Sequence, residues 1–143
     1  MPNNADELDR LLKFSFSLVG RSEYPLQFGV TGSRGFTDLS VVSFAIGAVG
    51  MFHHDAIMHN GGAGGADALC LEVWQHYGAN TFIHAPRLEI YGSPRAYHVR
   101  NQEIVDRADL LLAFKRGETN GTLGTIKKAE EREIPVFVFN QDL

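Results

Sequence analysis

The stretch His59-Asn60-Gly61-Gly62-Ala63-Gly64-Gly65-Ala66-Asp67 places four glycines within five positions. A short apolar run over 56–58 precedes it, and apolar residues at helical spacing follow it over 69–77. This order predicts a strand, a glycine-rich turn and a helix. Glycine lets backbone N–H groups approach a ligand closely, and a helix N-terminus attracts anions. The stretch therefore predicts a phosphate- or nucleotide-binding loop; a tight turn without a ligand is the alternative.

The same alternation of strand and helix recurs along the chain. Apolar segments predict strands over 26–30, 56–58, 81–85, 108–114 and 134–139. This pattern predicts a Rossmann-like, doubly wound α/β fold, with a mainly parallel sheet of about five strands and helices on both faces. An amphipathic helix over 5–19 comes first. We expect this helix and its linker to occupy residues 1–24 and a nucleotide-binding domain to occupy 25–143.

Composition narrows the functional classes. The 143 residues carry a formal net charge of −4, whereas proteins that bind nucleic acid backbones are usually basic. Nucleic acid is therefore an unlikely partner on charge alone. The chain has no apolar run near the ~20 residues of a membrane span and no secretory pattern at its N-terminus. The lone Cys70 lies on the apolar face of its helix, so we expect it in the core and the protein in the cytoplasm.

Polar and glycine-rich loops follow the predicted strands at 32–36, 60–65, 86–95 and 115–124. The carboxyl ends of parallel strands meet at one edge, where such sheets bind ligands. In the first loop, Ser33 can hydrogen-bond a phosphate or ribose and Arg34 can form a bidentate contact, although an exposed turn arginine is the alternative. Gly121-Thr122-x-Gly124-Thr125 predicts a second anion cradle at a helix N-terminus, with a simple helix cap as the alternative.

Arginines on the helix before the fourth strand supply further anion ligands. The candidate ligand-binding residues are Gly32, Ser33, Arg34, Phe36, Gly61, Gly62, Ala63, Gly64, Asp67, Arg95, Arg100, Asn101, Gly121, Thr122, Gly124 and Thr125. His53 and His54 are adjacent and would point about 100° apart on a helix, which makes them a poor metal pair. We therefore expect no metal and no cofactor.

These motifs together resemble the SLOG superfamily, the Smf/DprA and "lonely guy" (LOG) group of Rossmann-like proteins. The chain is most similar to the YpsA/YspA-related branch, over residues 26–140. The resemblance implies a nucleotide or nucleotide-derived ligand held by the glycine loops. The enzymes of this group hydrolyse the base–ribose bond of nucleoside 5′-monophosphates with an arginine, which corresponds here to Arg100, and a glutamate. Lys128 stands at the position of that glutamate.

Three functions follow from the resemblance. The main expectation is a sensor or sequestering protein that binds a nucleoside monophosphate or an NAD- or ADP-ribose-type signal without being an enzyme. The alternative is a LOG-type phosphoribohydrolase that uses Arg100 with a carboxylate from Glu131, Glu118 or Asp67. The third is single-stranded DNA binding of the DprA type. We expect a homodimer, because the N-terminal helix needs a surface to cover its apolar face and LOG-like proteins commonly pair.

Overall fold

Five parallel strands form one sheet within residues 3–78, 80–117 and 119–143, which the computed structural model describes. The strand order is β3-β2-β1-β4-β5. The strands are β1 (Gln27–Gly32), β2 (Ile57–Asn60), β3 (Thr81–Ile83), β4 (Leu110–Arg116) and β5 (Val136–Gln141). The helices are α1 (Asn4–Ser17), α2 (Leu39–Gly50), α3 (Ala66–Trp74), α4 (Leu88–Tyr91), α5 (Arg95–Arg107) and α6 (Asn120–Glu131). The predicted Rossmann-like α/β fold is confirmed, and each strand pair is parallel.

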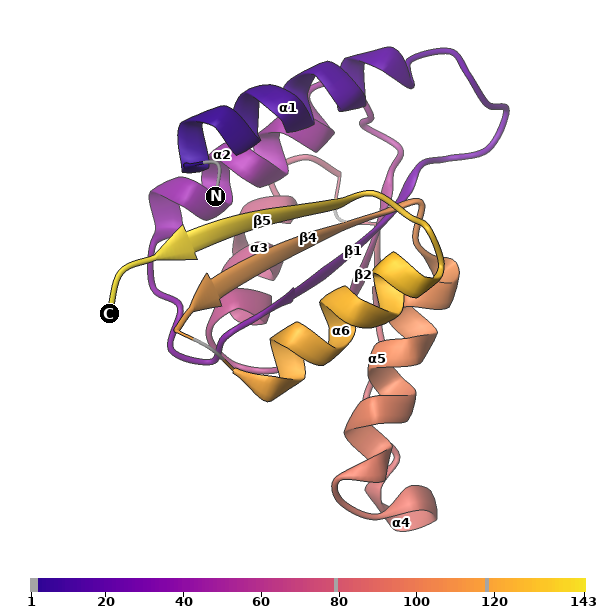
Figure 1. Cartoon of the computed structure of the whole chain (residues 1–143). Helices are drawn as coiled ribbons and strands as arrows, with labels where there is room; N and C mark the ends of the chain where they lie inside the picture. The colour runs from indigo at the N-terminus through magenta and orange to yellow at the C-terminus, as the bar shows by residue number, and fades with distance from the viewer. Residues whose placement is uncertain (1–2, 79, 118) are drawn as a thin grey trace.

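Helices cover both faces of this sheet. Helices α1, α2 and α3 lie on one face, while α5 and α6 lie on the other (Figure 1). The chain builds outward from β1 to β3 in one direction and then returns to add β4 and β5 on the other side. Loops diverge at this reversal between β1 and β4, and open sheets bind ligands there.

The central strands are buried on both faces. Every residue of β4 from Leu110 to Lys115 is buried, as its near-continuous apolar run predicts. The ring of Phe28 packs edge-on against Trp74, with 5.0 Å between centroids, on the face that α3 covers. Cys70 is fully buried in the same core. The core thus holds β1 and β4 rigidly and fixes where their carboxyl ends emerge.

The apolar face of α1 packs on its own chain. Leu11 is completely buried in the core, and the ring of Phe14 lies 5.5 Å from that of Phe137 on β5. The helix also packs along α2 (Figure 1). Helix α2 and strand β5 therefore cover part of this face, whereas Phe16 is 64% exposed, and the expected homodimer stays a prediction.

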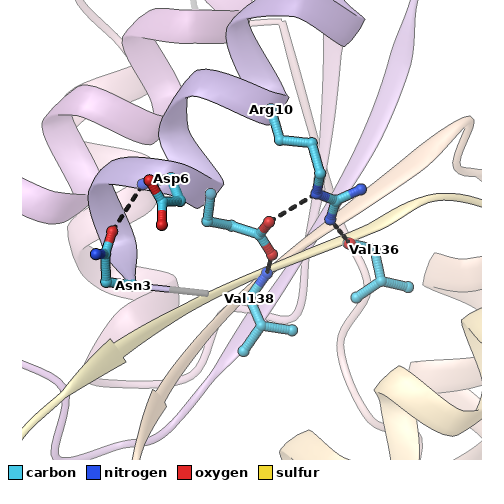
Figure 2. Close-up of polar contacts among 6 residues, drawn as sticks. Asn3, Asp6, Arg10, Val136 and Val138 are labelled. Atoms are coloured by element: carbon cyan, nitrogen blue, oxygen red, sulfur yellow. Dashed lines mark hydrogen bonds and ion pairs between the residues drawn. The ribbon is translucent and has the colours of Figure 1, made fainter. Parts of the chain in front are cut away.

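Polar side chains of α1 reach the backbone of the edge strand β5. Glu7 accepts the N–H of Val138 at 2.9 Å, and Arg10 donates from Nη2 to the carbonyl of Val136 at 2.6 Å. Arg10 also donates from Nε to Glu7 at 2.7 Å, so Glu7, Arg10 and the backbone of β5 form one hydrogen-bond network (Figure 2). Asn4 makes two bonds to the backbone of Asn140, at 2.7 and 2.8 Å. The network satisfies backbone groups of β5 that face away from β4.

Burial opposes ionisation of the Glu7 carboxyl, but Arg10 and the Val138 N–H outweigh it and lower the pKa of Glu7. The helix itself begins where Asn3 accepts the N–H of Asp6 at 2.8 Å (Figure 2). Helix α1 is therefore capped at its N-terminus by Asn3 and hydrogen-bonded to β5 through Glu7 and Arg10.

Some element boundaries differ from the sequence-based expectation. The predicted loop 86–95 contains the short helix α4 and the first residue of α5, and the last strand is shifted to Val136–Gln141. Pro135 precedes that strand, and its carbonyl already accepts the N–H of Leu111 on β4 at 2.9 Å. Among the described residues, no helix is both long and apolar enough to cross a membrane.

Candidate functional site

A cavity of about 400 Å³ lies at the carboxyl edge of the sheet, between the ends of β1, β2 and β4 and the helices α5 and α6. The candidate residues that line it are Gly32, Ser33, Arg34, Gly61, Ala63, Asp67, Arg100, Asn101, Gly121 and Thr122. Tyr97 and Arg116 line it as well. Loops far apart in the sequence therefore meet in one place, because the parallel strands deliver them to the same edge.

Ser33 is buried and ties the first loop to β4. Its N–H donates to the carbonyl of Phe114 at 2.9 Å, and its Oγ accepts the N–H of Arg116 at 2.9 Å. Its own carbonyl accepts the N–H of Ala66 at 3.1 Å. Ser33 thus joins three segments of the site and positions Arg34, the exposed residue next to it.

Two glycines of the second loop make room for protein groups. A Cβ at Gly61 would lie 2.5 Å from Nη1 of Arg100 and 3.0 Å from Oδ2 of Asp67. Gly65 has a φ of +66°, and a Cβ there would collide with the backbone of Arg34. A Cβ at Gly64, in contrast, would meet nothing within 4 Å. Gly61 and Gly65 therefore have reasons to be glycine that involve no ligand.

The second loop is also shaped by Asn60, which sequence reasoning missed. Its side chain donates to the carbonyl of Asp67 at 3.0 Å and accepts the N–H of Gly62 at 2.7 Å. Asn60 is completely buried at the end of β2. An asparagine directly before glycine at the end of a strand is a common signal for such a turn.

Arg100 and Asp67 form the floor of the cavity, and both are more than nine-tenths buried. Arg100 donates from Nη1 to the Gly61 carbonyl at 2.8 Å and from Nε to Asn101 at 2.8 Å. Asp67 accepts the N–H of Ala63 at 3.2 Å. These bonds hold the guanidinium in one orientation, facing the cavity that it lines.

The ionisable groups of the cavity influence one another. Burial raises the pKa of Asp67, although the Ala63 N–H and the charges of Arg100 and Arg34 oppose that shift. Burial lowers the pKa of Arg100; Asp67 opposes this shift and the positive charge of Arg34 adds to it. Arg34 and Arg100 are thus close enough to repel each other, which favours an anion between them.

Arg116 is a cavity residue that sequence reasoning also missed. It donates from Nη1 to the carbonyl of Gly35 at 3.2 Å, while its Nε is buried without a hydrogen-bond partner in the described part of the chain. Gly32 and Phe114 are paired in the sheet, so Arg34 and Arg116 each follow that pair by two residues. An arginine at the end of an apolar strand was the available signal.

The remaining candidates lie outside this cavity. Phe36 is buried in the core, 5.5 Å from the ring of Phe114. Thr125 is buried and donates to the carbonyl of Gly121 at 2.9 Å. Arg95 lies over the ring of Tyr91, 5.4 Å from its centroid. Gly62, Gly64 and Gly124 are not among the residues that line the cavity.

Of the carboxylates proposed to act with Arg100, Glu131 lies away from it and Asp67 lies near it. Glu131 is exposed in the last turn of α6, whereas Gly121 and Thr122 at the other end of that helix line the cavity. Glu118 lies outside the described residues. Asp67 is the carboxylate near Arg100 in the described part of the site. The geometry therefore does not favour hydrolysis by Arg100 and Glu131.

The histidines His53 and His59 form hydrogen bonds within the protein and lie outside the cavity. His59 is buried and bonded through Nδ1 to His84 at 2.9 Å and through Nε2 to Gln27 at 2.7 Å. His53 donates from Nε2 to the carbonyl of Ser15 at 2.8 Å. Across residues 3–78, 80–117 and 119–143, no group of three His, Cys, Asp or Glu side chains is placed to hold a metal ion.

A larger cavity, of about 620 Å³, lies at the opposite edge beneath the linker before β1. Two of its polar side chains bond to neighbouring backbone: His53 bonds to the carbonyl of Ser15, and Asp109 accepts the N–H of Gln27 at 2.9 Å. Arginines from three elements converge in the smaller cavity instead. The carboxyl edge is therefore the better candidate for a binding site.

Comparison with known proteins identifies the fold. No protein-family model and no curated protein sequence matches the chain. DNA processing protein A (DprA) from Streptococcus pneumoniae has the same fold, with a TM-score of 0.67, 18% identity, and coverage of 90% of this chain and 51% of that one. The chain therefore spans about half the length of that protein.

DprA from Helicobacter pylori is similar in the same way, with a TM-score of 0.67 and 16% identity over 94% of this chain and 69% of that one. Its structure is described as showing a unique single-stranded DNA binding mode. At 16–18% identity, the two DprA structures show that the chain shares their fold.

These neighbours correct two expectations. The prediction of a small nucleotide-type ligand is wrong, and so is the prediction that nucleic acid is an unlikely partner, because the two solved structures described above are DNA processing proteins, and one of them is described as binding single-stranded DNA. The error has a physical reason. The net charge of −4 is a sum over the whole chain, whereas the described lining of the cavity carries three arginines and one carboxylate.

Proposed function

We propose that this chain binds single-stranded DNA in the cavity at the carboxyl edge of its sheet. The observation that carries the proposal is the convergence of Arg34, Arg100 and Arg116 on one cavity. Guanidinium groups form bidentate hydrogen bonds with phosphate. The DprA structures of the same fold support the choice of DNA as the ligand.

Two of the three arginines, Arg34 and Arg100, have distinct parts in this proposal. Arg34 is exposed at the rim and meets the DNA backbone first. Arg100 is oriented by Gly61 and Asn101 and binds a phosphate deeper in the cavity. Tyr97 lines the same cavity and offers a ring face on which a base can stack. A hollow of about 400 Å³ has room for one unpaired nucleotide.

Fluorescence anisotropy with a labelled thymidine oligomer of about 20 nucleotides tests the proposal. We expect saturable binding that weakens as salt rises, and weaker binding of the matching duplex. Arg34→Gln should lower the affinity and reduce the slope of log K against log salt by about 0.7, the value for one phosphate contact on a single strand.

Arg21→Gln is the matched control, because it removes the same charge from an exposed residue at the opposite edge of the sheet. It should leave the affinity and the salt slope unchanged. Absence of saturable binding at about 50 mM salt would contradict the proposal, and so would equal losses in the two variants.

The finer family assignment is part of the proposal. We place the chain in the YpsA/YspA-related branch on its Gly32-Ser33-Arg34 and glycine-loop motifs, which support that branch independently of the DprA structures.

A further inference from the structure

The charge of the cavity exceeds what an internal DNA phosphate requires. Arg34, Arg100 and Arg116 carry three positive charges, and Asp67 is the carboxylate in the described lining. An internal phosphodiester brings one negative charge. A phosphomonoester brings about −1.5 to −2 at pH 7 and three terminal oxygens that accept hydrogen bonds. The balance of charge therefore matches a phosphomonoester better than a phosphodiester.

The donors that remain unused point to the same ligand. Arg116 is partly exposed and lines the cavity; because its Nε is enclosed by protein, the Nη atoms are the donors that a ligand can contact. The side chain of Arg34 makes no hydrogen bond to a described residue, yet its charge acts on both Arg100 and Asp67. An anion with several oxygens can satisfy both arginines at once.

The arrangement of backbone supports this choice. Arg116 is bonded to the carbonyl of Gly35, next to Arg34, so both guanidiniums approach the cavity from adjacent strand ends. The N-terminus of the twelve-residue helix α6 lies across from them and contributes Gly121 and Thr122 to the lining. The partial positive charge of this terminus adds to that of the arginines.

We propose that the cavity binds the phosphomonoester end of a DNA single strand, with Arg116 providing the contact that distinguishes this end from an internal phosphodiester. The inference rests on the proposed binding of single-stranded DNA and deepens it. A chemical end of the strand, rather than its sequence, is then the feature that the cavity selects.

Anisotropy titrations with oligomers labelled at a central base test the inference. Four strands are compared: one with a 5′-phosphate, one with a 3′-phosphate, one with hydroxyl ends, and a hydroxyl-ended strand longer by one nucleotide. The longer strand controls for the additional charge. We expect one phosphorylated strand to bind at least about tenfold more tightly than the longer hydroxyl strand, and that strand identifies the preferred end.

Arg116→Gln should make the affinities for the phosphorylated strand and the longer hydroxyl strand nearly equal. Arg116→Lys should retain part of the preference for the phosphorylated strand, because lysine keeps the charge without the planar guanidinium. Arg21→Gln, at the opposite edge, should keep the wild-type ratio. Thermal unfolding of each variant establishes that it is folded. If Arg116→Gln does not fold, the inference is still tested by two results: the affinity ratio of phosphorylated to longer hydroxyl strand in the wild-type protein, and the same ratio in Arg116→Lys.

The outcomes separate the two proposals. Equal binding of phosphorylated and hydroxyl strands would overturn the preference for an end and leave DNA binding intact. Loss of the preference in Arg21→Gln would also overturn it, because the effect would then be one of overall charge. No binding of any strand would overturn both proposals.

Discussion

Arg100 donates a hydrogen bond from Nη1 to the carbonyl oxygen of Gly61 at 2.8 Å, and its guanidinium occupies the space where a Cβ of residue 61 would lie. A residue of α5 is thereby held by the loop after β2, although 39 positions separate them in the sequence. The most buried arginine of the cavity thus depends on the absence of a side chain in another element.

Gly61→Ala should therefore impair the site. The new Cβ would lie 2.5 Å from Nη1 and displace the guanidinium. We expect a loss of about 1–3 kcal/mol in the free energy of unfolding, as for other overpacked positions, and about a tenfold loss of affinity for single-stranded DNA. Urea unfolding measures the first and anisotropy the second.

Gly64→Ala is the control in the same loop, because a Cβ there meets nothing within 4 Å. It should change the free energy of unfolding by no more than about 0.5 kcal/mol. A Gly61→Ala protein that matches this control in both measurements would show that Arg100 does not need its observed position.

The contact of Glu7 with β5 yields a second prediction. Glu7→Ala removes the acceptor of the Val138 N–H and the partner of Arg10. Because Glu7 is 5% exposed, water replaces that acceptor poorly. We expect the free energy of unfolding to fall by about 2–3 kcal/mol, measured by urea denaturation followed by circular dichroism.

Asp9→Ala removes a carboxylate of the same helix that pairs with Lys13 on its exposed side, at 2.8 Å. This control should leave the urea midpoint unchanged, because exposed ion pairs contribute little. Similar midpoints for the two variants would mean that the edge of β5 needs no cap from α1.

His59 makes stability depend on pH. Burial, with the nearby charges of His84 and Arg107, lowers the pKa of His59 to about 4 in the folded protein, against about 6.5 in the unfolded chain. The unfolded chain therefore binds a proton first as pH falls. The contribution of His59 to stability is constant above about pH 6.5 and should decrease by about 2–3 kcal/mol between there and pH 4.

Urea midpoints at a series of pH values measure this dependence. His59→Gln should flatten the profile between pH 6.5 and 4, at the cost of lower stability at neutral pH. His76→Gln replaces an exposed histidine and should reproduce the wild-type profile. An unchanged slope in His59→Gln would assign the acid sensitivity to other groups, of which His84 is the first, since burial also lowers its pKa.

The fold could be predicted from the sequence because its strongest signals are local. The apolar run at Leu110–Phe114 predicts a strand buried on both faces, and the alternation of strands and helices predicts a parallel sheet. Amphipathic spacing likewise predicts α1. The surface on which α1 packs could not be predicted from local sequence, because Glu7 and Arg10 contact a strand more than 120 residues away.

The site was predicted less completely for the same reason. Sequence position alone brings Arg34 and Arg100 to the carboxyl edge, and the structure places them there. Positions 61 and 65 need glycine because Arg100 and the backbone of Arg34 approach them closely. The number of glycines in the loop does not show whether such an approach comes from the protein or from a ligand. Arg116 ends an apolar strand and begins a polar stretch, and sequence alone does not distinguish such an arginine from one in a solvent-exposed loop.

The bonds from Asn4, Glu7 and Arg10 to β5 also bear on how the protein behaves at high concentration. An unguarded edge strand recruits strands from other molecules and begins aggregation. The opposite edge of the sheet is protected differently, because β3 is only three residues long. Helix α1 therefore protects the protein from aggregation. A variant lacking residues 1–17 would expose the unpaired backbone groups of the six-residue strand β5 to other molecules.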